Sequence, residues 1–138
     1  NEVLAVLYFC FQGLEPSEYI DPKYIEADLF SAFSNLMTDI RTALERTRQE
    51  ETGIRGHIDN YTNILGVIDP VLLETIESNG VVHQYYSLRW FMLLMCQEFK
   101  IEDTLRLWDS LFSADAHGQL LSQPRRFQYI DFVAVALV

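Results

Sequence analysis

Apolar residues recur at steps of three and four along most of this 138-residue chain, and this spacing limits the possible folds more than any other feature of the sequence. Such steps place the side chains on one face of an α-helix. The clearest stripe is Ile25, Leu29, Phe33, Leu36 and Ile40. Alternation with a period of two, which indicates strands, is scarce. The sequence therefore predicts an all-α fold, an irregular helical bundle around a hydrophobic core.

Two Asp-Pro pairs mark the starts of helices. Asp21-Pro22 and Asp69-Pro70 each combine a capping carboxylate with a proline, whose fixed φ suits the first helical position. The second pair should start a short helix from Val71 to Ser78, because Asn79-Gly80 stops it. Gly53 opens another periodic segment, whose apolar stripe is Ile54, Ile58, Tyr61, Leu65 and Ile68.

Local composition predicts four further segments. The apolar stretch from Glu2 to Phe11 indicates a buried helix, and the glycine, prolines and serine between Gln12 and Pro22 indicate a loop. The highly charged stretch from Arg41 to Thr52 should be solvated, partly as helix and partly as linker. The longest apolar helix is expected from about Tyr85 to Phe99 and should lie in the core.

The C-terminal third contains one clearly amphipathic helix, predicted from Glu102 to Phe112. Its apolar face consists of Ile101, Leu105, Trp108, Leu111 and Phe112. Glu102 and Arg106 lie one turn apart on another face and can form an i,i+4 ion pair. A loop is expected from Ser113 to Gly118, before a final apolar segment from Phe127 to Val138.

Both termini fall inside apolar helical segments. A complete domain rarely leaves both ends as bare hydrophobic helix. We therefore expect residues 1–138 to be part of a single larger domain, truncated at both ends. The isolated fragment should be marginally stable or prone to aggregation.

The composition argues against several classes of function. Hydrophobic residues make up 49% of the chain, which is enough for a sizeable core. The formal net charge of −10 disfavours nucleic acid, whose phosphates bind Lys and Arg, and also an anionic membrane surface. No apolar run reaches the roughly 20 residues that span a bilayer. Cys10 and Cys96 lie in separate apolar runs, which predicts buried free thiols in a reducing compartment.

No pattern of reactive side chains predicts catalysis or metal binding. His57, His83 and His117 have no second ligand at a metal-binding spacing, and we interpret His83 as a polar residue at a helix entry. The sequence has no phosphate-binding loop and no nucleophilic-serine motif. Glu98 ends an apolar helix and needs a partner, for which Arg89 and Arg106 are the candidates. We predict no catalytic residue, no cofactor and no metal ion.

The block from Ser87 to Phe112 carries uncommon residues at fixed distances. Its sequence, SLRWFMLLMCQEFKIEDTLRLWDSLF, joins an Arg-Trp apolar helix, a Glu-Phe pair and an Arg-x-Trp-Asp helix. This pattern closely resembles the TBC family of Rab GTPase-activating proteins. The matching residues are Trp90, Glu98, Phe99, Arg106, Trp108 and Asp109. Residues 26–30 (EADLF) and 1–5 (NEVLA) also resemble family segments, so that the resemblance covers nearly the whole chain.

The resemblance implies the C-terminal subdomain of a TBC domain, acting on a GTP-bound Rab-type small GTPase. Such a protein is a regulator rather than an enzyme, because the GTPase performs the hydrolysis. The family supplies an arginine from an Ile-x-x-Asp-x-x-Arg motif and a glutamine from a Tyr-x-Gln-Gly motif. Both motifs precede the segment that this chain matches. Gln12, in Phe11-Gln12-Gly13, lies too late in the chain and is assigned to a loop turn, so no catalytic residue is expected.

The resemblance also assigns roles to its matching residues. Five are expected to form scaffold, with both tryptophans in the core: Trp90, Glu98, Arg106, Trp108 and Asp109. GTPase contacts are expected in loops at 84–87 and near 113–118. The protein would be cytoplasmic, or peripheral on endomembranes, and act in vesicle traffic. The alternatives are a non-catalytic TBC-like interaction module and an unrelated helical bundle, which the Arg-x-Trp-Asp block disfavours.

Overall fold

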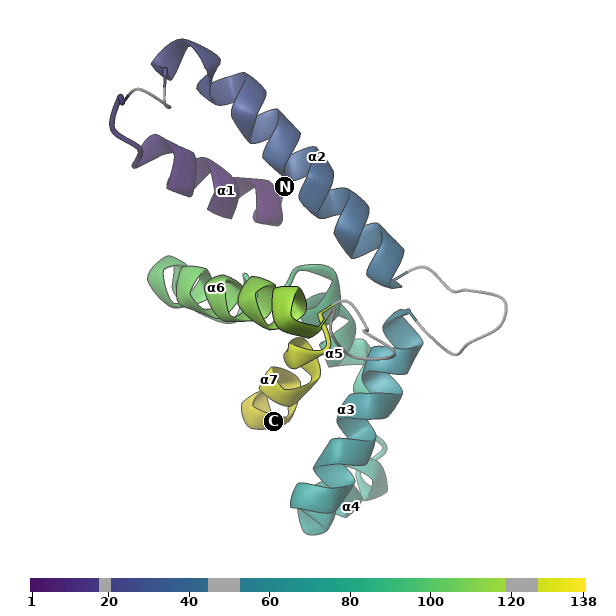
Figure 1. Cartoon of the computed structure of the whole chain (residues 1–138). Coiled ribbons are helices and arrows are strands. Elements are labelled where there is room, and N and C mark those ends of the chain that lie inside the picture. The colour runs from purple at the N-terminus through teal and green to yellow at the C-terminus, as the bar shows by residue number, and fades with distance from the viewer. Residues whose placement is uncertain (18–20, 45–52, 119–126) are drawn as a thin grey trace.

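The computed structural model describes residues 1–17, 21–44, 53–118 and 127–138, with all side chains except those of 43–44 and 115–118. Within these ranges the regular elements are seven α-helices and one short 3-10 helix, and no strand forms (Figure 1). The predicted all-α class is confirmed. Part of the predicted loop before Pro22 and most of the predicted linker before Gly53 lie outside the described residues.

The first two helices pack together as an arm at the top of Figure 1. The chain passes from α1 (Glu2–Gln12) through the 3-10 helix η1 (Pro22–Tyr24) into α2 (Ile25–Leu44). The carboxylate of Asp21 accepts a hydrogen bond of 2.9 Å from the backbone N–H of Lys23, as the Asp-Pro pair predicts. Leu29 and Ile40 of the predicted α2 stripe are buried, so the stripe faces the core.

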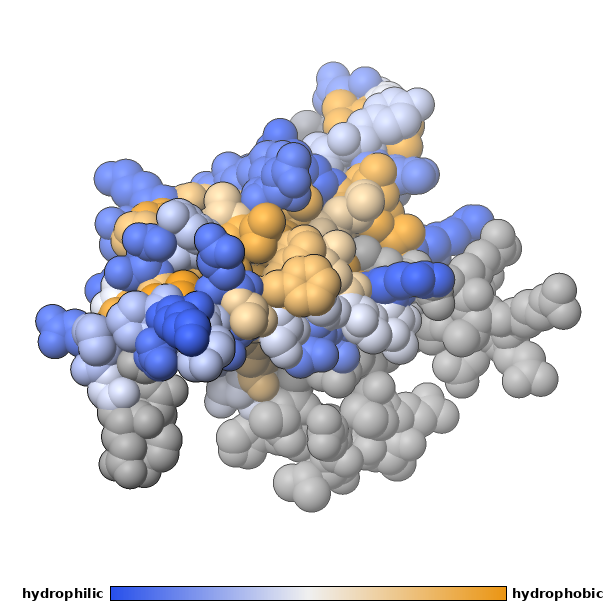
Figure 2. All heavy atoms as spheres, turned by 90° about the horizontal axis from the view of Figure 1, so that it is seen from above, coloured by the Kyte–Doolittle hydropathy of each residue, from blue (hydrophilic) through white to orange (hydrophobic). Residues whose placement is uncertain are grey.

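Helix α1 is less buried than predicted. Val3 and Val6 lie in the core, but Tyr8 and Phe9 are 51% and 49% exposed. The reason is that α1 packs mainly against α2 and leaves its other side open. Figure 2 looks onto the side of the molecule where this arm lies, and hydrophobic side chains gather in the middle of that face. Gln12 is the last residue of α1 rather than part of a loop turn.

The lower body is built on α3 (Ile54–Ile68), which packs against α4 (Pro70–Ser78), α5 (His83–Met92) and α7 (Tyr129–Leu137) (Figure 1). The short α4 confirms the second Asp-Pro prediction. Asp69 caps it by accepting from the backbone N–H of Leu72 at 2.9 Å. The chain then leaves α4 at Gly80, whose φ of 70° suits glycine.

The predicted apolar helix from Tyr85 to Phe99 is wrong in its second half. Helix α5 ends at Met92, and the next helix, α6 (Ile101–Gly118), begins only after a series of turns. Leu94 and Met95 cause the break, because both adopt left-handed backbone conformations, with φ of 47° and 61°. The loop predicted from Ser113 to Gly118 is also wrong, since α6 continues through it.

The core joins the arm to the lower body. Its buried residues come from α1, α2, α3, α5, α6 and α7 and from the turns that precede α6 and α7. They are Val3, Val6, Ile40, Tyr61, Leu65, Trp90, Phe91, Leu94, Met95, Trp108, Leu111, Phe127, Ile130 and Ala134. Both tryptophans lie in this core, as the sequence predicts. Ile68, the last residue of the predicted α3 stripe, is instead 66% exposed.

Candidate functional site

The turn between α5 and α6 and the two helices that flank it contain the motif residues found between positions 87 and 112. The two left-handed residues of the turn, Leu94 and Met95, are almost completely buried. A left-handed conformation costs a non-glycine residue about 1–2 kcal/mol, so surrounding contacts must hold it. The indole N–H of Trp108 donates to the Leu94 carbonyl at 2.9 Å. The backbone N–H of Met95 donates to the Trp90 carbonyl, also at 2.9 Å. The Trp108 side chain and the Trp90 backbone therefore hold this turn.

An ion pair closes the same turn on the outside. Arg89 of α5 contacts the Oε1 atom of Glu98 through both Nη2, at 2.5 Å, and Nε, at 2.9 Å. This settles the partner of Glu98 that the sequence left open. Arg106 lies 3.6 Å from Asp103 on the exposed face of α6, in place of the predicted pair with Glu102.

Asp109 is exposed on α6 and lies near the arm. Burial raises the pKa of the Cys10 thiol, and the negative charge of Asp109 raises it further. Burial likewise raises the pKa of Cys96. Both cysteines are free and only partly buried, so the thiols are more accessible than predicted but poorly ionised.

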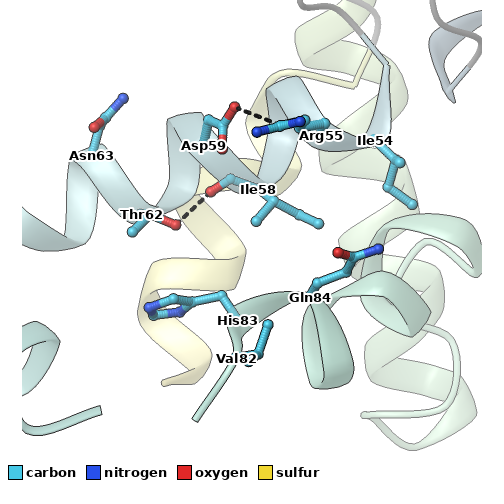
Figure 3. Close-up of a pocket in the computed structure, with 9 residues that line it drawn as sticks. All are labelled: Ile54, Arg55, Ile58, Asp59, Thr62, Asn63, Val82, His83 and Gln84. Atoms are coloured by element: carbon cyan, nitrogen blue, oxygen red, sulfur yellow. Dashed lines mark hydrogen bonds and ion pairs between the residues drawn. The ribbon is translucent and has the colours of Figure 1, made fainter. Parts of the chain in front are cut away.

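A groove of about 860 Å³ lies between α3 and the start of α5 (Figure 3). Its lining combines aliphatic, charged and amide side chains: Ile54, Arg55, Ile58, Asp59, Thr62, Asn63, Val82, His83 and Gln84. On its rim, Arg55 and Asp59 are 3.9 Å apart and more than half exposed, so both charges remain available to a partner. A groove of this size and mixed lining can accept a peptide segment or a small ligand.

The predicted contact loop at 84–87 is a helical segment of α5. The residues of this segment differ in their exposure. Gln84 is exposed and lines the groove, whereas Ser87 is fully buried and donates to the His83 carbonyl at 2.7 Å. Only part of this prediction therefore coincides with an open surface.

A buried carboxylate forms hydrogen bonds with the inner side of α3, the helix that forms one wall of the groove. Asp131 of α7 is completely buried, and its two oxygens accept from two side chains of α3. His57 donates from Nδ1 to Oδ1 at 2.6 Å, and Asn60 donates from Nδ2 to Oδ2 at 2.7 Å. The His57 ring stacks on Phe91 of α5, with centroids 5.4 Å apart. One network thus joins α3, α5 and α7.

A second polar cluster lies between α3 and α5. The hydroxyl groups of Tyr61 and Tyr86 contact each other, and His83 Nδ1 lies 2.9 Å and 2.5 Å from them. Burial raises the pKa of both tyrosines. His83 begins α5, as predicted, while its Nε2 atom is buried without a hydrogen-bond partner among the described residues. Neither tyrosine is a ready proton acceptor at neutral pH.

The described residues contain no group of three or more metal-binding side chains. None of the described helices is long and apolar enough to cross a membrane. The side chain of His117 lies outside the described residues.

Sequence reasoning missed Asp131 and Asn60 altogether, and it considered His57 only as a metal ligand. One signal pointed to Asp131, because a carboxylate inside an otherwise apolar final helix needs a buried partner. The identity of that partner depends on how α3 and α7 pack, which no sequence spacing indicates.

Comparison with known proteins relates the whole chain to one family. The Rab-GTPase-TBC domain model matches residues 1–135. A TBC domain-containing protein of Schizosaccharomyces pombe is 33% identical over 89% of this chain and 20% of its own length. Human TBC1 domain family member 13 is 30% identical over 100% of this chain and 32% of its own length.

A GTPase-activating protein of Schizosaccharomyces pombe, gyp1, is 28% identical over 68% of this chain and 18% of its own length. The chain thus spans a third or less of each of these relatives. No solved structure gives a significant match.

Proposed function

Because the chain belongs to the Rab-GTPase-TBC domain family, we propose that it forms part of a GTPase-activating protein for Rab-type small GTPases. The observation that carries the proposal is the family match over residues 1–135, which includes every residue of the turn between α5 and α6. One relative, gyp1, is named a GTPase-activating protein. The GTPase would perform the hydrolysis, so the chain acts as a regulator in vesicle traffic.

Within such a protein, this chain corresponds to the C-terminal part of the TBC domain. The order of the motifs supports this assignment, because residues 1–5 resemble the segment that follows the family's glutamine motif. Residues 1–138 contain no Ile-x-x-Asp-x-x-Arg sequence. The charge that develops on the transferred phosphoryl group would be stabilised by an arginine from outside this segment. Here the chain contributes scaffold and partner surface.

We assign the partner surface to the groove between α3 and α5. Its aliphatic lining residues, Ile54, Ile58 and Val82, can contact an apolar side chain of the GTPase. Arg55 and Asp59 on the rim can pair with charges of opposite sign. Gln84, exposed at the start of α5, adds an amide that can pair with a peptide backbone.

Single-turnover GTP hydrolysis on a panel of Rab GTPases tests the proposal. Two proteins are compared, this chain alone and a version preceded by about a hundred residues that carry the family's arginine and glutamine motifs. Only the longer protein should accelerate hydrolysis. Activity of the shorter one would mean that a residue of this chain supplies a catalytic side chain, with Gln12 the first to examine.

The alternative is a TBC-like module that binds its partner without catalysis. Binding of a GTP-loaded Rab GTPase by the longer protein, without faster hydrolysis, would favour it. Failure of both proteins to bind or activate any Rab GTPase would contradict the proposed function.

A further inference from the structure

We infer that Asp131 is a positioning residue, which pins the rotation of α3 about its own axis and so arranges the groove that the partner contacts. The inference rests on the proposed function for its partner, and on the hydrogen bonds of Asp131 for its mechanism. Asp131 itself is completely buried and would not touch a partner.

The pin consists of two hydrogen bonds that reach one carboxylate from one helix. Oδ1 accepts from His57 and Oδ2 from Asn60, at 2.6 Å and 2.7 Å. His57 and Asn60 are three residues apart, so they lie on neighbouring turns of the same face of α3. Rotation or sliding of α3 against α7 would bend at least one of the two bonds, and hydrogen bonds weaken steeply when they bend.

Apolar contacts between the same helices are less directional. Tyr61 and Leu65 of α3 are buried, and Ile130 and Ala134 of α7 are buried in the same core. Hydrophobic packing is proportional to buried area and tolerates repacking, so it stabilises the helix pair more than it defines one rotation. The two hydrogen bonds of the carboxylate are directional, so they define the rotation of α3 that these apolar contacts leave open.

The same network reaches both walls of the groove. Arg55, Asp59 and Thr62 line the groove from α3 and alternate along the helix with His57 and Asn60 on its inner side. Phe91 of α5, the helix that forms the other wall, stacks on the His57 ring. A change in the pin would therefore displace the two walls relative to each other.

The positioning role of Asp131 can be tested separately from its contribution to stability. Replacing both partners of a buried hydrogen bond by apolar groups of similar shape is often neutral or stabilising, because no polar group then has to lose its hydration. The double variant H57L/D131L removes the pin but keeps the contact apolar. Asn60 loses its acceptor in this variant but is only half-buried, so we expect a midpoint of thermal unfolding close to that of the wild-type chain. The affinity for the GTP-loaded Rab GTPase should fall by at least about tenfold, since binding depends on how well the surface is preorganised.

Leu111→Ala is the matched control. Leu111 is fully buried in α6 and does not line the groove, so its truncation should lower the unfolding midpoint with little loss of affinity. D131N is the conservative variant, and should lose less affinity than the double variant because its amide oxygen still accepts one of the two bonds. Unchanged affinity of H57L/D131L would overturn the inference, as would an affinity loss that merely follows the loss of stability.

A second measurement does not need a partner. Backbone amide chemical shifts should change in H57L/D131L at Val82 and Gln84, on the α5 wall of the groove and far in sequence from both substitutions. Shift changes confined to residues in direct contact with positions 57 and 131 would contradict the pin. If the wild-type chain binds no Rab GTPase, the proposed function fails, and these shifts still decide whether Asp131 sets the rotation of α3.

Discussion

The turn between α5 and α6 and the groove between α3 and α5 share one helix but are held in different ways. At the turn, Trp108 and the Arg89–Glu98 pair hold a strained backbone that lies close to them in sequence. At the groove, the wall is fixed by Asp131, which lies 74 and 71 positions from its partners His57 and Asn60. The turn is therefore a local structure, and the groove depends on the packing of the whole lower body.

The difference shows what each region contributes. The turn and its two flanking helices carry the uncommon residues of the family pattern, and both tryptophans are buried. The groove carries exposed charges and amides that vary easily without loss of the core. The structural support and the proposed partner surface are thus formed by different residues. Variants in the two regions should therefore separate stability from binding.

The largest loss of stability is expected at the turn, from Trp108→Ala. Removing a buried tryptophan typically costs about 3–5 kcal/mol, and the Leu94 carbonyl also loses its donor. Urea unfolding followed by circular dichroism measures the free energy. Trp108→Phe keeps most of the side-chain volume. It should lower the free energy of unfolding by about 1–3 kcal/mol, because a buried carbonyl is left unpaired. Equal losses for both variants would mean that the indole hydrogen bond, and not the packed volume of the ring, holds the turn.

Alkaline pH should lower the free energy of unfolding through a buried tyrosine between α3 and α5. Burial raises the pKa of Tyr61 above that of a tyrosine in the unfolded chain, which is about 10. Its stabilising contribution is therefore complete below pH 10 and is lost as the pH rises further. For this group, each pH unit above 10 should lower the free energy of unfolding by about 1.4 kcal/mol.

Urea unfolding between pH 9 and pH 11 tests this, with Tyr61→Phe expected to reduce the slope. Tyr85→Phe replaces a tyrosine that is 85% exposed and is the control, which should keep the slope of the wild-type chain. A slope that Tyr61→Phe leaves unchanged would assign the alkaline loss to other groups.

The ion pair of the turn should make a smaller and salt-dependent contribution. Glu98 is mostly buried and Arg89 about half exposed, so Arg89→Met should cost about 1 kcal/mol at low salt. Because salt screens exposed charges, the difference from the wild-type chain should shrink in 1 M NaCl, where the Debye length is about 3 Å. Arg106→Met breaks a fully surface-exposed pair and is the control, with a loss close to zero. An Arg89→Met loss that salt does not reduce would mean that the pair with the mostly buried Glu98 is shielded from the ions of the solvent.

The sequence predicted the helices better than it predicted the turn and the groove. Caps such as Asp21 and Asp69 act within a few residues, so spacing is enough to find them. The end of α5 could not be predicted, because Leu94 and Met95 are neither glycine nor proline and adopt left-handed conformations only through contacts with Trp90 and Trp108. The pairing of His57 with Asp131 depends on the packing of distant helices, which periodicity does not describe.

The smallest effect on stability, and a clear effect on binding, is expected on the rim of the groove. Arg55→Glu changes an exposed side chain of α3 and should alter the free energy of unfolding by no more than about 0.5 kcal/mol. It also places two like charges, at positions 55 and 59, beside each other at the proposed partner surface. Rim charges act mainly on the association rate, so we expect affinity for the Rab GTPase to fall about three- to tenfold, less at high salt.

Lys100→Glu is the matched control, because it makes the same change of charge at the turn between α5 and α6. Both variants shift the net charge of the chain by the same amount, so a general electrostatic repulsion of the partner would weaken binding equally in the two. Surface plasmon resonance with a GTP-loaded Rab GTPase separates the rates. A lower association rate for Arg55→Glu alone would assign recognition to the groove, and equal losses would show that the partner responds to the overall negative charge and not to this surface.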